Sequence, residues 1–245
     1  MPKRGETTID RAEVEQFSKL AAQWWDERGP MAMLHKFNPV RLAYIRDQVA
    51  THFGRNPRQI GCLSGLRILD IGCGGGILSE PLARLGANVI GADPAEANIA
   101  VARKHAALTD LVIDYRAVTA EALADKNEKF DVVLAMEVVE HVADVPAFIA
   151  GLAEALAPDG LLILSTPNRT AWSKLVMIGI GEGTGRIPRG THHWDQFLTP
   201  EDLSTQLREA GLAVVDTTGL SFSLTRGFRL SDDMSLNYLV TATRA

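Results

Sequence analysis

The sequence is poor in cysteine and has neither a long hydrophobic run nor a block of basic residues. Its 245 residues include only two cysteines, Cys62 and Cys73, which lie near and inside a glycine-rich segment. A disulfide there would have no obvious stabilising purpose, so a reducing compartment is expected. No stretch is apolar enough to span a bilayer, and the first ten residues lack the core of a secretory signal. These absences predict a protein that is soluble or at most peripheral to the membrane. The short N-terminal lead is typical of a bacterial cytoplasmic protein, and a processed organellar form would look similar.

The charge pattern argues against nucleic acid as a partner. The formal net charge of −5 comes from interspersed signs, without the clustered lysine and arginine of a nucleic-acid footprint. A hydrophobic content of 46% over 245 residues is enough for one sizeable core, so we expect a single domain, 1–245. Residues 11–60 carry amphipathic helix patterns, with a break at Phe37-Asn38-Pro39, and predict a helical N-terminal cap.

Short apolar runs alternate with helix-length segments through most of the chain after the cap. This alternation predicts an α/β fold with a parallel sheet, in which ligands bind beyond the carboxyl ends of the strands. A helix is expected over Pro200–Ala210. The expected strands are Arg67–Ile71, Asn88–Ala92, Val112–Arg116, Asp131–Met136, Leu161–Ser165, Leu212–Thr217 and Leu236–Thr243.

The most informative motif is an acid at the end of a strand followed by three alternating glycines. Asp70 precedes Gly72, Gly74 and Gly76, which lack a Cβ and allow a sharp turn and close approach to a ligand. The spacing differs from the G-x-G-x-x-G of dinucleotide sites, and Asp70 and the nearby Glu80 add negative charge. A cationic ligand without phosphate fits such a loop, which favours S-adenosylmethionine over a nicotinamide cofactor.

Two further residues are candidate cofactor contacts, each with a structural alternative. Asp93 follows the second strand about twenty residues after the first glycine, where a doubly wound fold places a carboxylate on ribose hydroxyls. Alternatively, Asp93 caps the helix that begins after Pro94. Met136 ends the fourth strand and either lines the adenosine site or fills the core.

Several longer motifs resemble those of the ubiquinone biosynthesis O-methyltransferase family over nearly all of the chain after Val14. The glycine motif alone is typical of all class I methyltransferases, whereas the Trp-Trp-Asp, Asn-Pro-x-Arg and Gly-Thr-His elements are more specific. The matching segments are Trp24-Trp25-Asp26, Phe37-Asn38-Pro39-Val40-Arg41-Leu42, Leu69 to Leu78, Met136 to Val142, Ser165-Thr166-Pro167-Asn168-Arg169, Gly190-Thr191-His192-His193-Trp194 and Phe197-Leu198-Thr199-Pro200.

This resemblance implies a class I, Rossmann-like fold with a seven-stranded, mostly parallel sheet and helices on both faces. The sequence pattern divides the expected domain into the cap (1–65), a cofactor-binding core (66–167), a lid or insert (168–198) and C-terminal core elements (199–245). The resemblance also implies S-adenosylmethionine-dependent methylation of phenolic oxygens on polyprenylated ubiquinone precursors, at both O-methylation steps. The cofactor contacts that it implies are Arg41, Gly72, Asp93 and Met136, to which the motif itself adds Asp70 and Gly74.

The methylation of a phenol, whose pKa is about 10 in water, requires a group that lowers this pKa or accepts the proton. Glu137, Glu140 and His141 have the spacing that would place them on one face of a helix start, where they could bind Mg²⁺ and stabilise a phenolate. Magnesium binding by similar family members supports this reading. Alternatively, the two glutamates stabilise the helix through its dipole and His141 packs locally. Glu137 and His141 are also candidate catalytic groups.

The insert offers another candidate base and a candidate membrane contact. His192 and the adjacent His193 could accept a proton near neutral pH, and His192 is a candidate substrate contact, although loop histidines are usually only solvated. An apolar stripe precedes them, with basic neighbours at Lys174, Arg186 and Arg189. The stripe predicts a lid over the site, reversible contact with the inner face of the membrane, or both. Its residues are Trp172, Leu175, Val176 and Ile180.

Three other functions remain open from the sequence. The chain could methylate another small phenol, or it could bind the cofactor without catalysis and dock partners in a ubiquinone-biosynthesis complex. A nicotinamide-dependent oxidoreductase is the third, although the G-x-G-x-G spacing argues against it.

Overall fold

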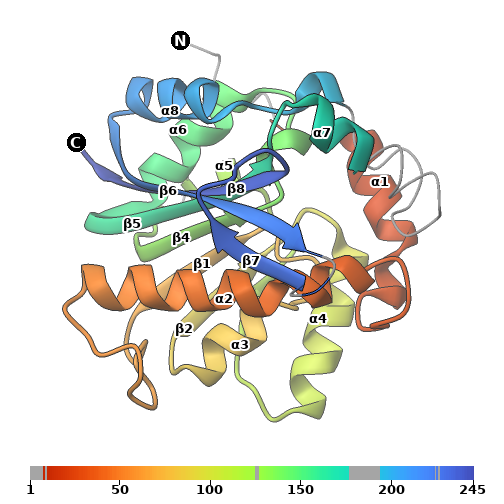
Figure 1. Cartoon of the computed structure of the whole chain (residues 1–245). Coiled ribbons are helices and arrows are strands. Elements are labelled where there is room, and N and C mark those ends of the chain that lie inside the picture. Colours follow the sequence, from red (N-terminus) through yellow and green to blue (C-terminus); the bar gives the residue numbers. More distant parts are fainter. Residues whose placement is uncertain (1–7, 9, 125–126, 177–193, 224, 226) are drawn as a thin grey trace.

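The computed structural model describes residues 8, 10–124, 127–176, 194–223, 225 and 227–245, and these build one eight-stranded sheet with helices on both faces (Figure 1). The strand order is β3-β2-β1-β4-β5-β8-β6-β7. Strands β1 to β5 are mutually parallel. Strand β8 is antiparallel to both β5 and β6, and β7 is antiparallel to β6. The predicted α/β class with a mostly parallel sheet is confirmed.

The strands lie close to the predicted segments, and two of them match to the residue. They are β1 (Arg67–Ile71), β2 (Asn88–Ala92), β3 (Asp114–Arg116), β4 (Phe130–Met136), β5 (Leu156–Pro167), β6 (Leu212–Ser223), β7 (Gly227–Ser231) and β8 (Asn237–Arg244). The prediction of seven strands is wrong by one, because the half-buried and exposed residues of β7 carry no apolar pattern that would identify a strand. Strand β7 pairs with β6 as an antiparallel edge strand.

The helices that form the cap and cover the sheet vary greatly in length. They are α1 (Arg11–Lys19), α2 (Ala32–His52), α3 (Ser79–Arg84), α4 (Glu96–Leu108), α5 (Ala120–Ala124), α6 (Val145–Ala155), α7 (Ala171–Ser173) and α8 (Pro200–Glu209), with the 3-10 turns η1 (Ala21–Gln23), η2 (Val139–His141) and η4 (Trp194–Gln196). Thr199 caps α8, with its hydroxyl accepting from the Asp202 amide, so the predicted helix over Pro200–Ala210 is confirmed.

The predicted break at Phe37-Asn38-Pro39 is wrong, because α2 continues through all three residues. Proline lacks an N–H and removes one bond from the helix ladder. Burial outweighs this loss, since Phe37, Tyr44, Ile45 and Val49 of α2 pack in the core beneath the sheet.

Alternating strand side chains divide the core into two layers. Leu69 of β1 and Val133 of β4 face the helices α6 and α8, whereas Ile68 and Val132 face α2 and α3. This alternation follows from the two-residue period of a strand and gives the sheet two buried faces.

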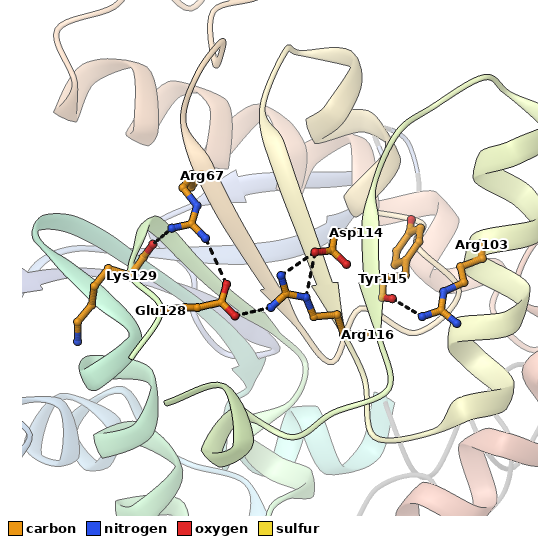
Figure 2. A network of polar contacts seen from close by, with 7 residues as sticks. All are labelled: Arg67, Arg103, Asp114, Tyr115, Arg116, Glu128 and Lys129. Atoms are coloured by element: carbon orange, nitrogen blue, oxygen red, sulfur yellow. Dashed lines mark hydrogen bonds and ion pairs between the residues drawn. The ribbon is translucent and has the colours of Figure 1, made fainter. Parts of the chain in front are cut away.

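A polar network braces the strands near β3 (Figure 2). Glu128 accepts from Arg116 at 2.6 Å and from Arg67 at 3.3 Å, and the carbonyl of Lys129 accepts from Arg67 at 2.8 Å. Arg103 of α4 donates to the Tyr115 carbonyl at 2.6 Å. These contacts hold β1, β3, α4 and the segment before β4 together.

Candidate functional site

The predicted site residues gather where the parallel strands end. Asp70 is the second-last residue of β1, Asp93 follows β2, and Glu137 follows β4. Met136 of β4 pairs in register with Ser165 of β5, and Pro167 of β5 pairs with Asn237 of β8. The sheet therefore brings residues from distant parts of the chain to one edge, as in other open parallel sheets that bind ligands there.

The glycine loop has a backbone that other residues would rarely adopt. Gly72, Gly74 and Gly76 have φ angles of +69°, +53° and +86°. A Cβ at Gly72 would lie 2.5 Å from Val138, and one at Gly76 would lie 2.2 Å from the Tyr115 hydroxyl. The turn therefore requires glycine for both conformation and space.

Asp93 fastens this loop to the end of β2. Its Oδ2 accepts from the Gly74 amide at 3.0 Å, while Oδ1 accepts from the Ala95 amide at 2.8 Å and from Asn98 at 3.2 Å. The bond to Ala95 lies before α4, whose N-cap is Ala95 itself, so the alternative that Asp93 caps this helix is wrong. Burial raises the pKa of the Asp93 carboxyl, and these hydrogen bonds oppose the rise. The ribose contact stays a prediction.

Asp70 is buried beside the loop, and its carboxylate accepts a hydrogen bond from the Ser79 hydroxyl at 2.6 Å. Burial raises the pKa of its carboxyl to about 6, while Ser79 and the positive charge of Arg41 oppose the rise. The carboxyl is therefore sensitive to any positive charge that approaches the loop.

Arg41 of α2 and Glu137 form a buried ion pair at the edge of the sheet, with 2.9 Å between Nη2 and Oε1. Glu137 also accepts from the Ser165 hydroxyl at 2.7 Å and from the Asn237 amide at 2.9 and 3.1 Å. Burial lowers the pKa of Arg41, and the carboxylates of Glu137 and Glu140 oppose that change. The Arg41 guanidinium also lies 4.2 Å from the centre of the Phe37 ring.

Glu140 is buried and only partly hydrogen-bonded within the described residues. Its Oε2 accepts from Thr166 at 3.0 Å, whereas Oε1 has no hydrogen-bond donor there and lies 4.0 Å from His141 Nε2. Burial, together with the charge of Glu137, raises the pKa of the Glu140 carboxyl to about 7. The His141 ring packs edge-on against Phe17, with 5.4 Å between ring centres.

The expectation that Glu137, Glu140 and His141 share one face of a helix start is wrong. Glu137 precedes η2 with a φ of +57°, and Arg41, Ser165 and Asn237 engage its carboxylate. Among the described residues, no group of three or more His, Cys, Asp or Glu side chains could hold a metal ion. The metal role of these residues, which this arrangement does not support, stays a prediction.

For Met136 and the residues of the insert, the structure gives little evidence of a functional role. Met136 is buried in the core layer beneath the sheet, which agrees with the core alternative, and its cofactor role stays a prediction. His192 and His193 lie outside the described residues, as do Ile180, Arg186 and Arg189. Sequence reasoning missed Asn237, because nothing near it in the chain marks it as a partner of Glu137.

The described start of the insert is partly helical and exposes apolar side chains. Trp172 and Leu175 are each 53% exposed, and Lys174 lies 4.6 Å from the centre of the Trp194 ring. The α-helix Ala171–Ser173 continues as a π-helical turn through Val176, so the described part of the expected stripe is helical, and Ile180 lies outside the described residues. Among the helices of the described residues, none is long and apolar enough to cross a membrane.

Comparison with known proteins places these features in a family. Residues 35–217 match a family model described as a methyltransferase domain. The chain is 52% identical to a ubiquinone biosynthesis O-methyltransferase of Sinorhizobium medicae, covering 100% of this chain and 99% of the relative. It is 54% identical to a protein of the same name from Chelativorans, covering 100% and 97%.

Solved structures agree on the fold at much lower identity. Magnesium protoporphyrin IX methyltransferase from Synechocystis with bound S-adenosylhomocysteine is 21% identical, with a TM-score of 0.63 and 94% of each chain covered. An S-adenosylmethionine-dependent methyltransferase from Clostridium acetobutylicum is 12% identical, with a TM-score of 0.62 and coverages of 95% and 97%. At these identities the similarity establishes the class I methyltransferase fold alone.

Proposed function

We propose that this chain, which belongs to the ubiquinone biosynthesis O-methyltransferase family, methylates phenolic hydroxyls of polyprenylated ubiquinone precursors at the carboxyl edge of its sheet. The donor is S-adenosylmethionine, and the proposal covers both O-methylation steps of the pathway. The observation that carries the site assignment is the group of acids around the glycine loop. Asp70, Glu137 and Glu140 lie close enough to the buried Arg41 to oppose the lowering of its pKa, and Asp93 lies near Asp70.

This excess of negative charge fits the donor, whose sulfonium and amino groups are positive and which supplies the methyl group when bound. In our assignment, Asp93 binds the ribose hydroxyls and the glycine loop lies against the cofactor. Glu137 and Asp70 stabilise its positive end. Arg41 holds the Glu137 carboxylate in place from α2, and Asn237 holds it from β8.

Glu140 and His141 are the better candidates for accepting the phenol proton. The Glu137 carboxylate is already engaged by three side chains, whereas Glu140 Oε1 has no hydrogen-bond donor among the described residues and lies 4.0 Å from His141 Nε2. A carboxyl with a pKa of about 7 is poised to exchange a proton at neutral pH. His192 stays a further candidate base.

The test is to incubate the purified protein with methyl-labelled S-adenosylmethionine and a short-tailed demethylubiquinol, with Mg²⁺ or with a chelator. We expect label in the methyl ether of the product. Loss of transfer with the chelator would support the predicted metal role, and unchanged transfer would remove it. Binding of the donor without transfer would favour another phenol or a non-catalytic binder. Family membership already rules out the nicotinamide-dependent alternative.

Reversible contact with the inner membrane face is the proposed route to a substrate with an isoprenoid tail. Exposed Trp172 and Leu175 support it. In co-sedimentation with anionic phospholipid vesicles, a Trp172→Ser, Leu175→Ser variant should bind less than the unmodified protein. Leu108→Ser, which removes a 74% exposed leucine from α4, is the control and should bind as the unmodified protein does. Equal partition of all three proteins would contradict membrane contact here. Docking in a ubiquinone-biosynthesis complex stays a proposal from the resemblance.

A further inference from the structure

Two consecutive tryptophans of the N-terminal cap lie directly on the glycine loop. Trp24 follows η1 and is 8% exposed. A Cβ at Gly74 would lie 2.3 Å from its ring, and a Cβ at Gly75 would lie 2.4 Å from the Trp24 Cβ. The indole therefore packs against bare glycine backbone, so Gly74 and Gly75 leave space for the cap as well as for a ligand.

Both indoles also donate hydrogen bonds toward the loop and its support. Trp24 Nε1 donates to Asn98 Oδ1 at 2.8 Å, and Trp25 Nε1 donates to the Gly75 carbonyl at 2.9 Å. The Trp25 ring stacks on His105 of α4, with 3.4 Å between ring centres and 6° between planes. The cap is thus anchored to the loop and to α4 together.

Asn98 connects Trp24 to the carboxylate assigned to the ribose. It is 1% exposed, and its Nδ2 donates to Asp93 Oδ1 at 3.2 Å while its Oδ1 accepts from Trp24. An indole N–H can only donate and an ionised carboxylate can only accept, so the two partners fix the orientation of the amide between them. Asp93 in turn accepts from the Gly74 amide.

We infer that Trp24 and Asn98 are positioning residues, through which the docked cap holds Asp93 and the glycine loop in the arrangement that binds the cofactor. The inference rests on the proposed function, because it takes Asp93 as the cofactor's carboxylate. Removal of the indole N–H leaves the Asn98 amide free to rotate, and Asp93 then loses a fixed donor.

The experiment measures S-adenosylhomocysteine binding by calorimetry, together with the thermal midpoint, for Trp24→Phe and Asn98→Ala. Trp24→Phe keeps an aromatic ring in the cap but removes the donor together with the outer part of the indole that lies on Gly74, so Asn98→Ala, which leaves the indole in place, is tested beside it. We expect the dissociation constant to rise about two- to tenfold, as for one lost hydrogen bond. In the methylation assay, KM for the donor should rise while kcat changes little, because the reacting groups are untouched.

Tyr44→Phe is the matched control. It removes an aromatic donor from the same cap, where the Tyr44 hydroxyl lies 2.6 Å from Asp216 and 2.7 Å from Thr241. This variant should have a lower thermal midpoint with unchanged binding. An equal loss of binding in Tyr44→Phe would overturn the inference, because general stability would then explain the effect.

A double variant and an Asp93 variant distinguish failure of the positioning role from failure of the proposed cofactor site. Trp24→Phe combined with Asn98→Ala should bind no more weakly than Asn98→Ala alone, since both changes interrupt one connection. Additive losses would contradict that connection. Asp93→Ala with unchanged binding would refute the proposed site itself. Weak binding by Asp93→Ala together with normal binding by both positioning variants would refute only the inference.

Discussion

At the scale of single residues, Glu137 is the position where the most constraints meet. Its φ of +57° is uncommon for a residue with a side chain, and such a conformation persists where surrounding contacts enforce it. Arg41, Ser165 and Asn237 supply those contacts from α2, β5 and β8. A residue at the end of a parallel strand whose backbone is strained and whose carboxylate is held by three elements is typical of a functional position. This supports the proposed role of Glu137 at the cofactor.

Substitution of Gly74 by alanine should destabilise the protein more than substitution of Gly211. Both glycines have positive φ, +53° and +77°, so both variants carry backbone strain. Only at Gly74 does the new Cβ meet a side chain, the Trp24 ring at 2.3 Å. The clash should cost about 1–3 kcal/mol beyond the strain.

Denaturant unfolding of the two ligand-free variants measures this difference. Gly211→Ala is the matched control, because a Cβ there meets nothing within 4 Å. Equal destabilisation of the two variants would mean that the Trp24 ring does not pack against Gly74 in solution.

At the scale of elements, the sequence predicted best where the pattern is local. The bounds of β1 and β2 were correct because short apolar runs between polar segments identify buried parallel strands. Strand β7 was missed because its five residues are only half-buried or exposed, and its conformation depends on pairing with β6.

The site divides in the same way. Asp70, the glycines and Asp93 follow from spacing around single strands, so sequence could identify them. Asn237 lies 100 residues from Glu137, and Trp24 lies 74 residues from Asn98. Only the folded chain brings these pairs together, the first at the end of the sheet and the second where the cap meets α4, and no local pattern encodes them.

Replacement of Pro39 by alanine should raise the free energy of unfolding, because Pro39 lies inside α2. Alanine restores an N–H that can donate to the carbonyl one turn earlier, and the gain should be up to about 3 kcal/mol. Pro200→Ala is the control. Pro200 lies in the first turn of α8, where the missing N–H costs nothing, and its replacement should be neutral or slightly destabilising. A destabilised Pro39→Ala variant in chemical denaturation would show that the packing of the proline ring outweighs the lost bond.

At the scale of the whole molecule, the carboxyl ends of the parallel strands bring several acidic side chains together and bury them. Asp70 and Glu140 are both 2% exposed, and burial raises the pKa of each carboxyl, to about 6 and about 7 respectively. Such groups destabilise the ligand-free fold once they are ionised, because the unfolded chain solvates their charge better. The protein therefore keeps a site suited to a positive ligand at the expense of its own stability near neutral pH.

The pH dependence of unfolding tests this trade-off at Asp70. Because the pKa of the folded carboxyl is about 6 and its ordinary value is 3.8, the folded state binds more protons between these values. The contribution of Asp70 to the free energy of unfolding should therefore fall as pH rises from about 4 to about 6, by up to about 3 kcal/mol, and then level off. In Asp70→Asn, Ser79 can still donate to the side-chain oxygen, but this titration is absent. Urea unfolding at pH 4 and pH 8 should show the unmodified protein losing more stability than the variant between the two values. Parallel losses would mean that Asp70 is solvated in the folded protein, and that the acidic edge is open to water before the cofactor binds.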